Sequence, residues 1–186
     1  MTLKKGFYTP LGAEGFEICH PINDSDFETI IAKVNGFPCG PSWKAIPMKL
    51  VDADDGEALE FSDSPWLGSH ALIFRKGAVE RLGELIKENG ELLPLQCEHA
   101  GLVIWNPRRS INALDETSSS LSRFSDGRIM MVMRYKFHQT LLKDVDVFKL
   151  PNLRVSPTFL SHRFVQAWRD CGLKGLDFEY VWGDSD

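Results

Sequence analysis

The strongest structural signal in the sequence is a helical pattern that gives way to a strand pattern near the C-terminus. Apolar residues recur at helical spacing over 157–170, and Gly172 follows as a stop. Residues 176–182 then alternate between apolar and polar, which is typical of a half-buried strand. Residues 77–89 have apolar residues at similar offsets before Gly90, and an apolar segment comes next. Two helix-then-strand units favour an α+β fold.

We therefore predict a single α+β domain with a mostly antiparallel sheet and about three main helices. A chain of 186 residues fits one domain. Residues 1–63 are expected to be an acidic N-terminal segment of that domain, and residues 64–186 its core with the two helix-strand units. The helices are expected near 25–35, 77–89 and 157–170, and the sheet is expected to contain 101–105, 129–137 and 176–182.

Local signals set the expected helix ends and core residues. Ser25 and Glu28 have the spacing of a capping box at the start of the first helix. Ser156 followed by proline predicts the start of the C-terminal helix at that point. Trp168 and Phe178 lie on the apolar faces of their elements, so we expect both to be buried.

Strand signals are clearest in the middle of the chain. Pro94 has no amide proton for a sheet ladder, so residues 92–95 are expected to form an edge strand. Residues 116–127 are rich in serine and contain an Asp-Gly pair, which predicts a loop. In the strand expected at 129–137, one face should carry the apolar side chains of Ile129, Met131, Met133, Tyr135 and Phe137.

The net charge of −5 is unevenly distributed. Residues 1–63 have 5 lysines and no arginine against 11 acidic residues, a balance of −6. Residues 64–186 have 16 basic and 15 acidic residues, a balance of +1. A net acidic field repels nucleic acid, so nucleic acid is not an expected partner, whereas a basic protein would be attracted.

The densest acidic stretch is the candidate partner-binding site. It contains Asp52, Asp54, Asp55, Glu57 and Glu60, in a region with few signals of regular structure. Loops of this kind often carry binding residues. The alternative interpretation is a solvated loop that only keeps the protein soluble.

The chemistry-bearing residues form no recognisable active site. The four cysteines form no C-x-x-C pair, so we expect reduced, mostly buried thiols. The five histidines do not form a zinc-binding helix motif, and no phosphate-binding glycine motif occurs. No catalytic residue, metal site or cofactor is predicted, although a thiol-based site at Cys97 or Cys171 stays open. No stretch approaches the ~20 apolar residues of a membrane span, so we expect a cytoplasmic protein without a membrane partner.

Several stretches together are similar to a known family pattern. In chain order they are Leu102–Pro107, Ile111–Ser119 with its Ala-Leu-Asp, Asp146–Leu150, and Val155–Ser156 with Gly172–Phe178. Lys149 stands where arginine is usual. Over roughly residues 60–182 the arrangement resembles immunity protein family eleven of bacterial polymorphic toxin systems, formerly a domain of unknown function. In structural terms, Asp115 with Ser118 or Ser119 is expected to fix a turn or the start of a short helix after the central strand.

The resemblance implies a cytoplasmic bacterial antitoxin that binds and neutralises one cognate toxin domain. It implies no catalytic residues. The acidic segment suits a basic toxin such as a nuclease. The alternative function is a small cytoplasmic enzyme with an unrecognised, thiol-based site. The toxin, its contact residues and the oligomeric state of the chain are left open.

Overall fold

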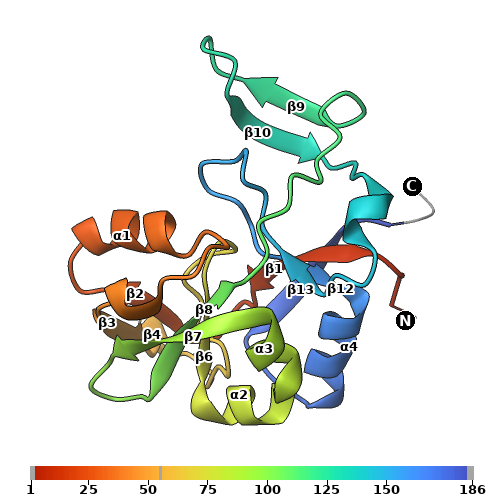
Figure 1. Ribbon diagram of the computed structural model, residues 1–186. Coiled ribbons are helices and arrows are strands. Elements are labelled where there is room, and N and C mark those ends of the chain that lie inside the picture. Colours follow the sequence, from red (N-terminus) through yellow and green to blue (C-terminus); the bar gives the residue numbers. More distant parts are fainter. Residues whose placement is uncertain (1–2, 55, 184–186) are drawn as a thin grey trace.

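A computed structural model describes residues 3–54 and 56–183, which form an α+β structure with mostly antiparallel sheets (Figure 1). The larger sheet has the order β2-β3-β7-β8-β6, and the smaller has the order β11-β12-β1-β13. The larger sheet comprises β2 (Ile18–Pro21), β3 (Ile46–Val51), β7 (Gly90–Gln96), β8 (Leu102–Pro107) and β6 (Leu72–Arg75). The smaller comprises β11 (Val147–Phe148), β12 (Phe159–Ser161), β1 (Phe7–Gly12) and β13 (Leu176–Trp182).

Helices cover both faces of the larger sheet. On one face, Ile30 and Val34, from α1 (Ser25–Lys33) and the residue after it, pack with Ile73 and Ile104. On the other face, Phe74 and Trp105 pack against α2 (Lys76–Leu82), α3 (Glu84–Asn89) and α4 (His162–Asp170). Short 3₁₀ helices occupy η1 (Gly40–Ser42) and η2 (Gln139–Leu142). Successive residues of β6 and β8 therefore serve two different cores, as strand alternation requires.

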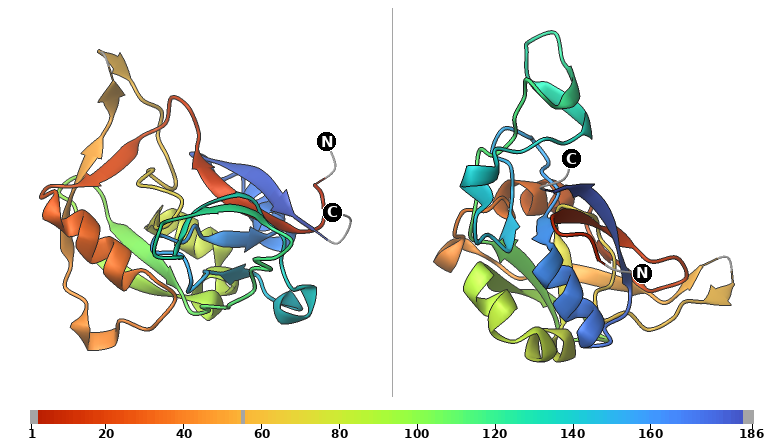
Figure 2. Two further views of the ribbon diagram at one scale, coloured as in Figure 1. Left: turned by 90° about the horizontal axis from the view of Figure 1, so that it is seen from above. Right: turned by 90° about the vertical axis from the view of Figure 1, so that its right-hand side faces the viewer.

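Two short hairpins lie outside these sheets. The first pairs β4 (Ala53–Asp54) with β5 (Glu57–Ala58), and the second pairs β9 (Ser120–Arg123) with β10 (Ile129–Arg134). Both project from the body of the molecule (Figure 2). The predicted single sheet is therefore wrong in detail, because residues 101–105, 129–137 and 176–182 contribute to three separate sheets.

The C-terminal helix begins later than predicted. Residues 159–161 form β12, which pairs with both β1 and β11. The helix starts at His162, where the Ser161 hydroxyl accepts a hydrogen bond from the Phe164 N–H at 3.3 Å. The Ser156 hydroxyl instead accepts from the Leu150 N–H at 2.8 Å. A serine before proline signals a chain bend, and the sheet pairing of the next residues delays the helix.

The other predicted helices also differ at particular residues. The helix expected over 77–89 is interrupted at Gly83, whose φ of 54° is left-handed. The predicted capping box does not form, because Ser25 is already helical and Asp24 is the N-cap without a side-chain bond. The side chain of Glu28 pairs instead with Arg154, at 3.2 Å.

Two strand predictions are wrong for a shared reason. Residues 92–95 lie inside the larger sheet, because β7 pairs with β3 as well as β8. Pro94 is tolerated there because the β3 ladder begins only at Leu95. Part of the loop predicted at 116–127 forms β9, in which Leu121 faces Val132. In both cases pairing with another strand decided the outcome: β3 is distant in sequence from β7, whereas β10 follows β9 directly in a hairpin.

Several predictions are confirmed. Gly172 ends α4 with φ 61°, and the Leu173 N–H donates to the Trp168 carbonyl in the manner of a Schellman motif. Asp115 fixes a turn by accepting from the N–H groups of Thr117 and Ser118 at 3.0 Å each. Trp168 is buried as predicted, but the predicted burial of Phe178 is wrong in degree, because that side chain is only half-buried beside Trp168.

Candidate partner-binding surface

The described part of the acidic segment forms the β4–β5 hairpin and the residues at its base. Asp52, Asp54, Glu57 and Glu60 are all exposed. Asp54 and Glu57 lie in the two strands of the hairpin, which projects from the body (Figure 2), and Asp52 and Glu60 lie next to those strands. Asp55, the fifth predicted site residue, lies outside the described residues. The structure thus brings the four described carboxylates onto one projecting element.

The base of this hairpin is held by main-chain hydrogen bonds. The Leu59 N–H donates to the Asp52 carbonyl at 2.8 Å and closes the hairpin. The Glu60 N–H donates to the Gly15 carbonyl at 2.7 Å, and the Glu17 N–H donates to the Glu60 carbonyl at 2.9 Å. These bonds fix the base of the acidic element, which is a requirement for a specific binding surface.

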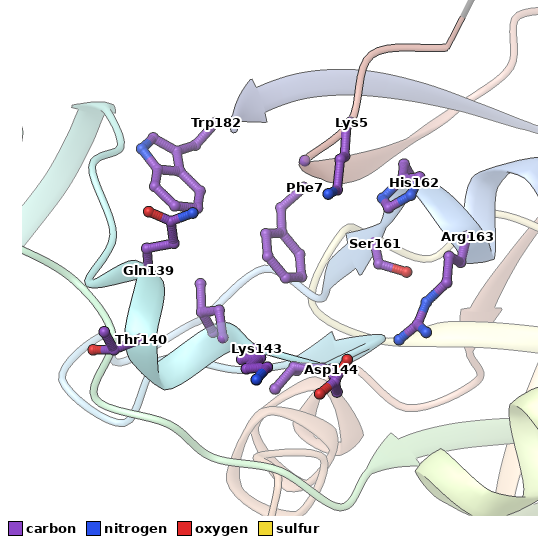
Figure 3. Close-up of a pocket in the computed structure, with 13 residues that line it drawn as sticks. Lys5, Phe7, Gln139, Thr140, Lys143, Asp144, Ser161, His162, Arg163 and Trp182 are labelled. Atoms are coloured by element: carbon purple, nitrogen blue, oxygen red, sulfur yellow. The ribbon is translucent and has the colours of Figure 1, made fainter. Parts of the chain in front are cut away.

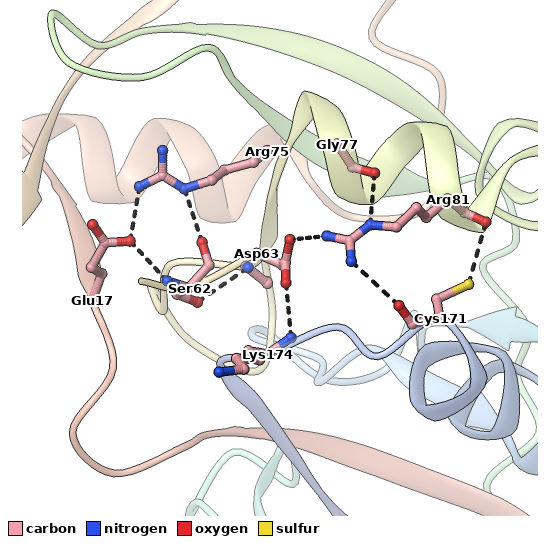
Figure 4. Close-up of polar contacts among 9 residues, drawn as sticks. Glu17, Ser62, Asp63, Arg75, Gly77, Arg81, Cys171 and Lys174 are labelled. Atoms are coloured by element: carbon pink, nitrogen blue, oxygen red, sulfur yellow. Dashed lines mark hydrogen bonds and ion pairs between the residues drawn. The ribbon is translucent and has the colours of Figure 1, made fainter. Parts of the chain in front are cut away.

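Two acidic residues of the N-terminal segment are buried instead of exposed (Figure 4). Glu17 accepts hydrogen bonds from Arg75 at 2.8 Å and from the Ser62 N–H at 2.9 Å. Asp63 pairs with Arg81 and also accepts from the Lys174 N–H at 2.9 Å. Because buried carboxylates need such partners, these two stabilise the fold and do not face a partner.

Phe61 adds an apolar group beside the acidic hairpin. Its side chain is 56% exposed, and the Arg75 guanidinium lies 4.5 Å from the ring centroid. Phe61 is not among the predicted site residues, because the spacing of Phe61 in the sequence does not distinguish an exposed aromatic residue from a core one. Aromatic residues surrounded by polar groups are common energetic centres of interfaces.

A cavity of about 670 Å³ lies on a different part of the molecule, at the junction of β1, β12, β13 and η2. Figure 3 shows Trp182 and Gln139 on one side of it and Ser161, His162 and Arg163 on the other. Asp146 accepts hydrogen bonds from Ser161 at 2.7 Å and from Arg163 at 2.8 Å, which fixes this polar wall. Its lining joins aromatic surface to basic side chains, a combination that suits an apolar or acidic group.

The four cysteine thiols differ in burial and in hydrogen-bond partners. Cys19 is buried, and burial raises its pKa to about 12. Cys39, Cys97 and Cys171 are half-buried, so the expectation of mostly buried thiols holds fully only for Cys19. The Cys171 thiol donates to the Arg81 carbonyl at 3.4 Å. No group of three potential metal ligands occurs in residues 3–54 or 56–183.

Part of the chain is similar to a known protein family. Residues 104–182 match the model of the Immunity protein family (Imm11), which confirms the resemblance for that part of the chain. No curated protein matches the sequence. The matched segment contains β9, β10, α4 and β13, whereas the acidic β4–β5 hairpin lies before it. Among the described helices, none is long and apolar enough to cross a membrane.

Proposed function

We propose that this chain, matched over residues 104–182 by an immunity protein family, is an antitoxin that neutralises a cognate bacterial toxin by stoichiometric binding. The family match is the observation that carries the proposal. A typical interface takes ~800 Å² from each partner, a small part of the 10076 Å² surface of this structure.

The β4–β5 hairpin is proposed as part of the toxin-binding surface. Its four described carboxylates are exposed on a projecting element with no basic residue between Asp52 and Glu60. Such a surface suits a basic toxin, for example a nuclease that acts in the cytoplasm. The opposite charges would steer the two proteins together over about one Debye length, ~10 Å at 0.1 M salt.

Co-expression tests the function directly. The toxin-like domain encoded next to this gene is expressed in bacteria with and without the chain. We expect growth to be rescued only by the chain, and a complex of fixed stoichiometry to be recovered. Rescue without a complex would favour the enzymatic alternative, and a variant with Cys97 and Cys171 both replaced by serine would then lose the rescue.

Neutralising the acidic hairpin should slow association. The variant replaces Asp52, Asp54, Asp55, Glu57 and Glu60 with asparagine or glutamine. We expect the association rate with the toxin domain to fall about tenfold at low salt, because exposed charges act mainly on the encounter step. The dissociation rate should change less. A kinetic binding assay at low salt and at 1 M salt measures both rates, and the difference should largely vanish at 1 M.

A second variant separates position from net charge. It neutralises five exposed acidic residues elsewhere, namely Glu80, Glu84, Glu88, Glu98 and Asp170. It changes the net charge equally, so equal slowing by both variants would show that the hairpin has no special role. Unchanged kinetics in the hairpin variant would leave the acidic segment as a solubilising loop. Thermal melts of both variants should match the wild type closely, since exposed charges contribute little to stability.

A further inference from the structure

The β9–β10 hairpin exposes an apolar surface that the fold does not use. Leu121 and Val132 face each other and pack onto an aromatic core that includes Phe137. Met130, Met131 and Met133 are 53%, 53% and 61% exposed. Phe124, in the connecting turn, is also exposed. The rest of the protein therefore covers Leu121 and Val132 in part, whereas it leaves the three methionines and Phe124 exposed.

These exposed side chains are clustered. Four of the ten large hydrophobic residues exposed in the described part of the chain fall between Phe124 and Met133. The hairpin projects away from both large sheets (Figures 1 and 2). Each of its strands pairs only with the other, so both outer edges lack a ladder partner. Two-stranded sheets are marginally stable in water, and clustered exposed apolar groups mark interaction surfaces.

The charge on this hairpin has the opposite sign to that of the β4–β5 hairpin. Residues 119–136 contain four basic residues and one acidic residue. Arg123 pairs with Glu116 at 2.6 Å, and Arg128 pairs with Asp126 at 2.7 Å. Arg134 is exposed and forms no ion pair with any described residue. The complementary surface is therefore an apolar patch bordered by carboxylates.

We propose that the face of β10 that carries Met131 and Met133, called here the methionine face, is the apolar anchor that holds the cognate toxin, against an apolar patch bordered by carboxylates on the toxin. This assignment rests on the proposed antitoxin function and names a surface for it. Methionine suits the role because its flexible, polarisable side chain adapts to an irregular partner surface. The acidic hairpin then governs encounter, and this hairpin governs how long the complex lasts.

A second copy of this chain fits the hairpin less well. In the register centred on Met131, antiparallel pairing of two β10 strands would place Arg134 of one copy opposite Arg128, the residue before β10, of the other. Like charges opposite each other destabilise a sheet. The hairpin's positive balance adds to this repulsion, so the charge pattern favours a different protein with acidic groups.

The test compares two double variants in the full chain. Met131→Ser with Met133→Ser removes the anchor, and Ile22→Ser with Phe37→Ser removes two equally exposed side chains elsewhere, at 63% and 59%. We expect the first variant to dissociate from the purified toxin domain at least tenfold faster, with a smaller change in association rate. The second should dissociate like the wild type. Both should melt at the wild-type temperature.

Hydrogen exchange supplies a readout that does not depend on substitution. Amide protons of residues 129–134 should exchange more slowly when the toxin domain is bound. If the wild type binds but the methionine variant binds equally well and exchange is unchanged, the anchor assignment is wrong while the antitoxin function stands. If the wild type does not bind at all, both are wrong. Two further outcomes would overturn the anchor assignment, if toxin binding is unaffected by the methionine substitutions. One is dimerisation in light scattering that depends on these methionines. The other is binding to phosphatidylglycerol vesicles that depends on them.

Discussion

Replacing Trp168 with alanine is expected to lower the free energy of unfolding by about 3–5 kcal/mol. Trp168 is 2% exposed and lies between two layers of the core. Its ring centroid is 6.2 Å from that of Phe74 on the larger sheet and 6.0 Å from that of Phe178 on the smaller one. Truncation would leave a cavity where α4 joins both sheets, and a rigid core closes such cavities only in part.

Urea denaturation of the wild type and the variant measures this loss. For a chain of this size the corresponding drop in melting temperature is roughly 6–20 °C. Phe37→Ala is the matched control, because that ring is 59% exposed and its removal should change stability by no more than about 0.5 kcal/mol. A loss below about 1 kcal/mol for Trp168→Ala would show that α4 does not pack as described.

Lys149 is expected to make the stability of the protein rise between pH 7 and pH 9. Its side chain is 1% exposed, and its ammonium group donates to the carbonyls of His70 and Ser156. Burial lowers the pKa of Lys149 from 10.5 to about 7. Between those values the unfolded chain keeps a proton on Lys149 that the folded protein has released, so raising the pH favours the folded state.

The size of this effect follows from proton linkage. From pH 7 to pH 9 the Lys149 contribution amounts to about 2 kcal/mol. Cys19 acts in the opposite direction, because burial raises its pKa to about 12 and the unfolded thiol ionises first. His70 titrates below this range in the folded state, since burial and the nearby Lys149 charge lower its pKa to about 4.

A comparison of variants isolates the contribution of Lys149 to the pH dependence of stability. Urea denaturation at pH 7, 8 and 9 should show a steeper rise in stability for the wild type than for Lys149→Met. The two proteins should differ by about 2 kcal/mol in the change from pH 7 to pH 9. Lys143→Met, which removes an exposed lysine, should keep the wild-type pH dependence. Parallel pH profiles for the wild type and Lys149→Met would mean that the buried amine keeps an ordinary pKa.

Features that depend on neighbouring residues could be predicted from the sequence. The strand at 176–182 forms as expected, because its alternation matches the two faces of a sheet. Gly172 ends α4 because glycine adopts the left-handed conformation without a steric penalty. The Asp115 turn likewise depends only on amides two and three residues away.

Features that depend on partners elsewhere in the fold could not be predicted from the sequence. Alternating apolar residues predicted one apolar face that includes Met131 and Met133, yet Met130 and Val132 are apolar too, so the pattern does not select which face is buried. Within the described residues the structure pairs this strand with β9 alone, packs the half-buried Val132 against the core and leaves Met131 and Met133 exposed. The sequence also gave no sign that Lys149 would be enclosed by two carbonyls, one of them 79 residues away.

The acidic segment shows both kinds of determination. The sequence by itself determined how much negative charge residues 1–63 carry and where it is densest. Only the tertiary structure decided which carboxylates are available to a partner. Glu17 and Asp63 are buried because Arg75 and Arg81 reach them from 58 and 18 residues along the chain. Asp52 and Asp54 stay exposed on a hairpin without such a partner among the described residues, because burying a carboxylate is unfavourable unless a donor of opposite charge is already in place.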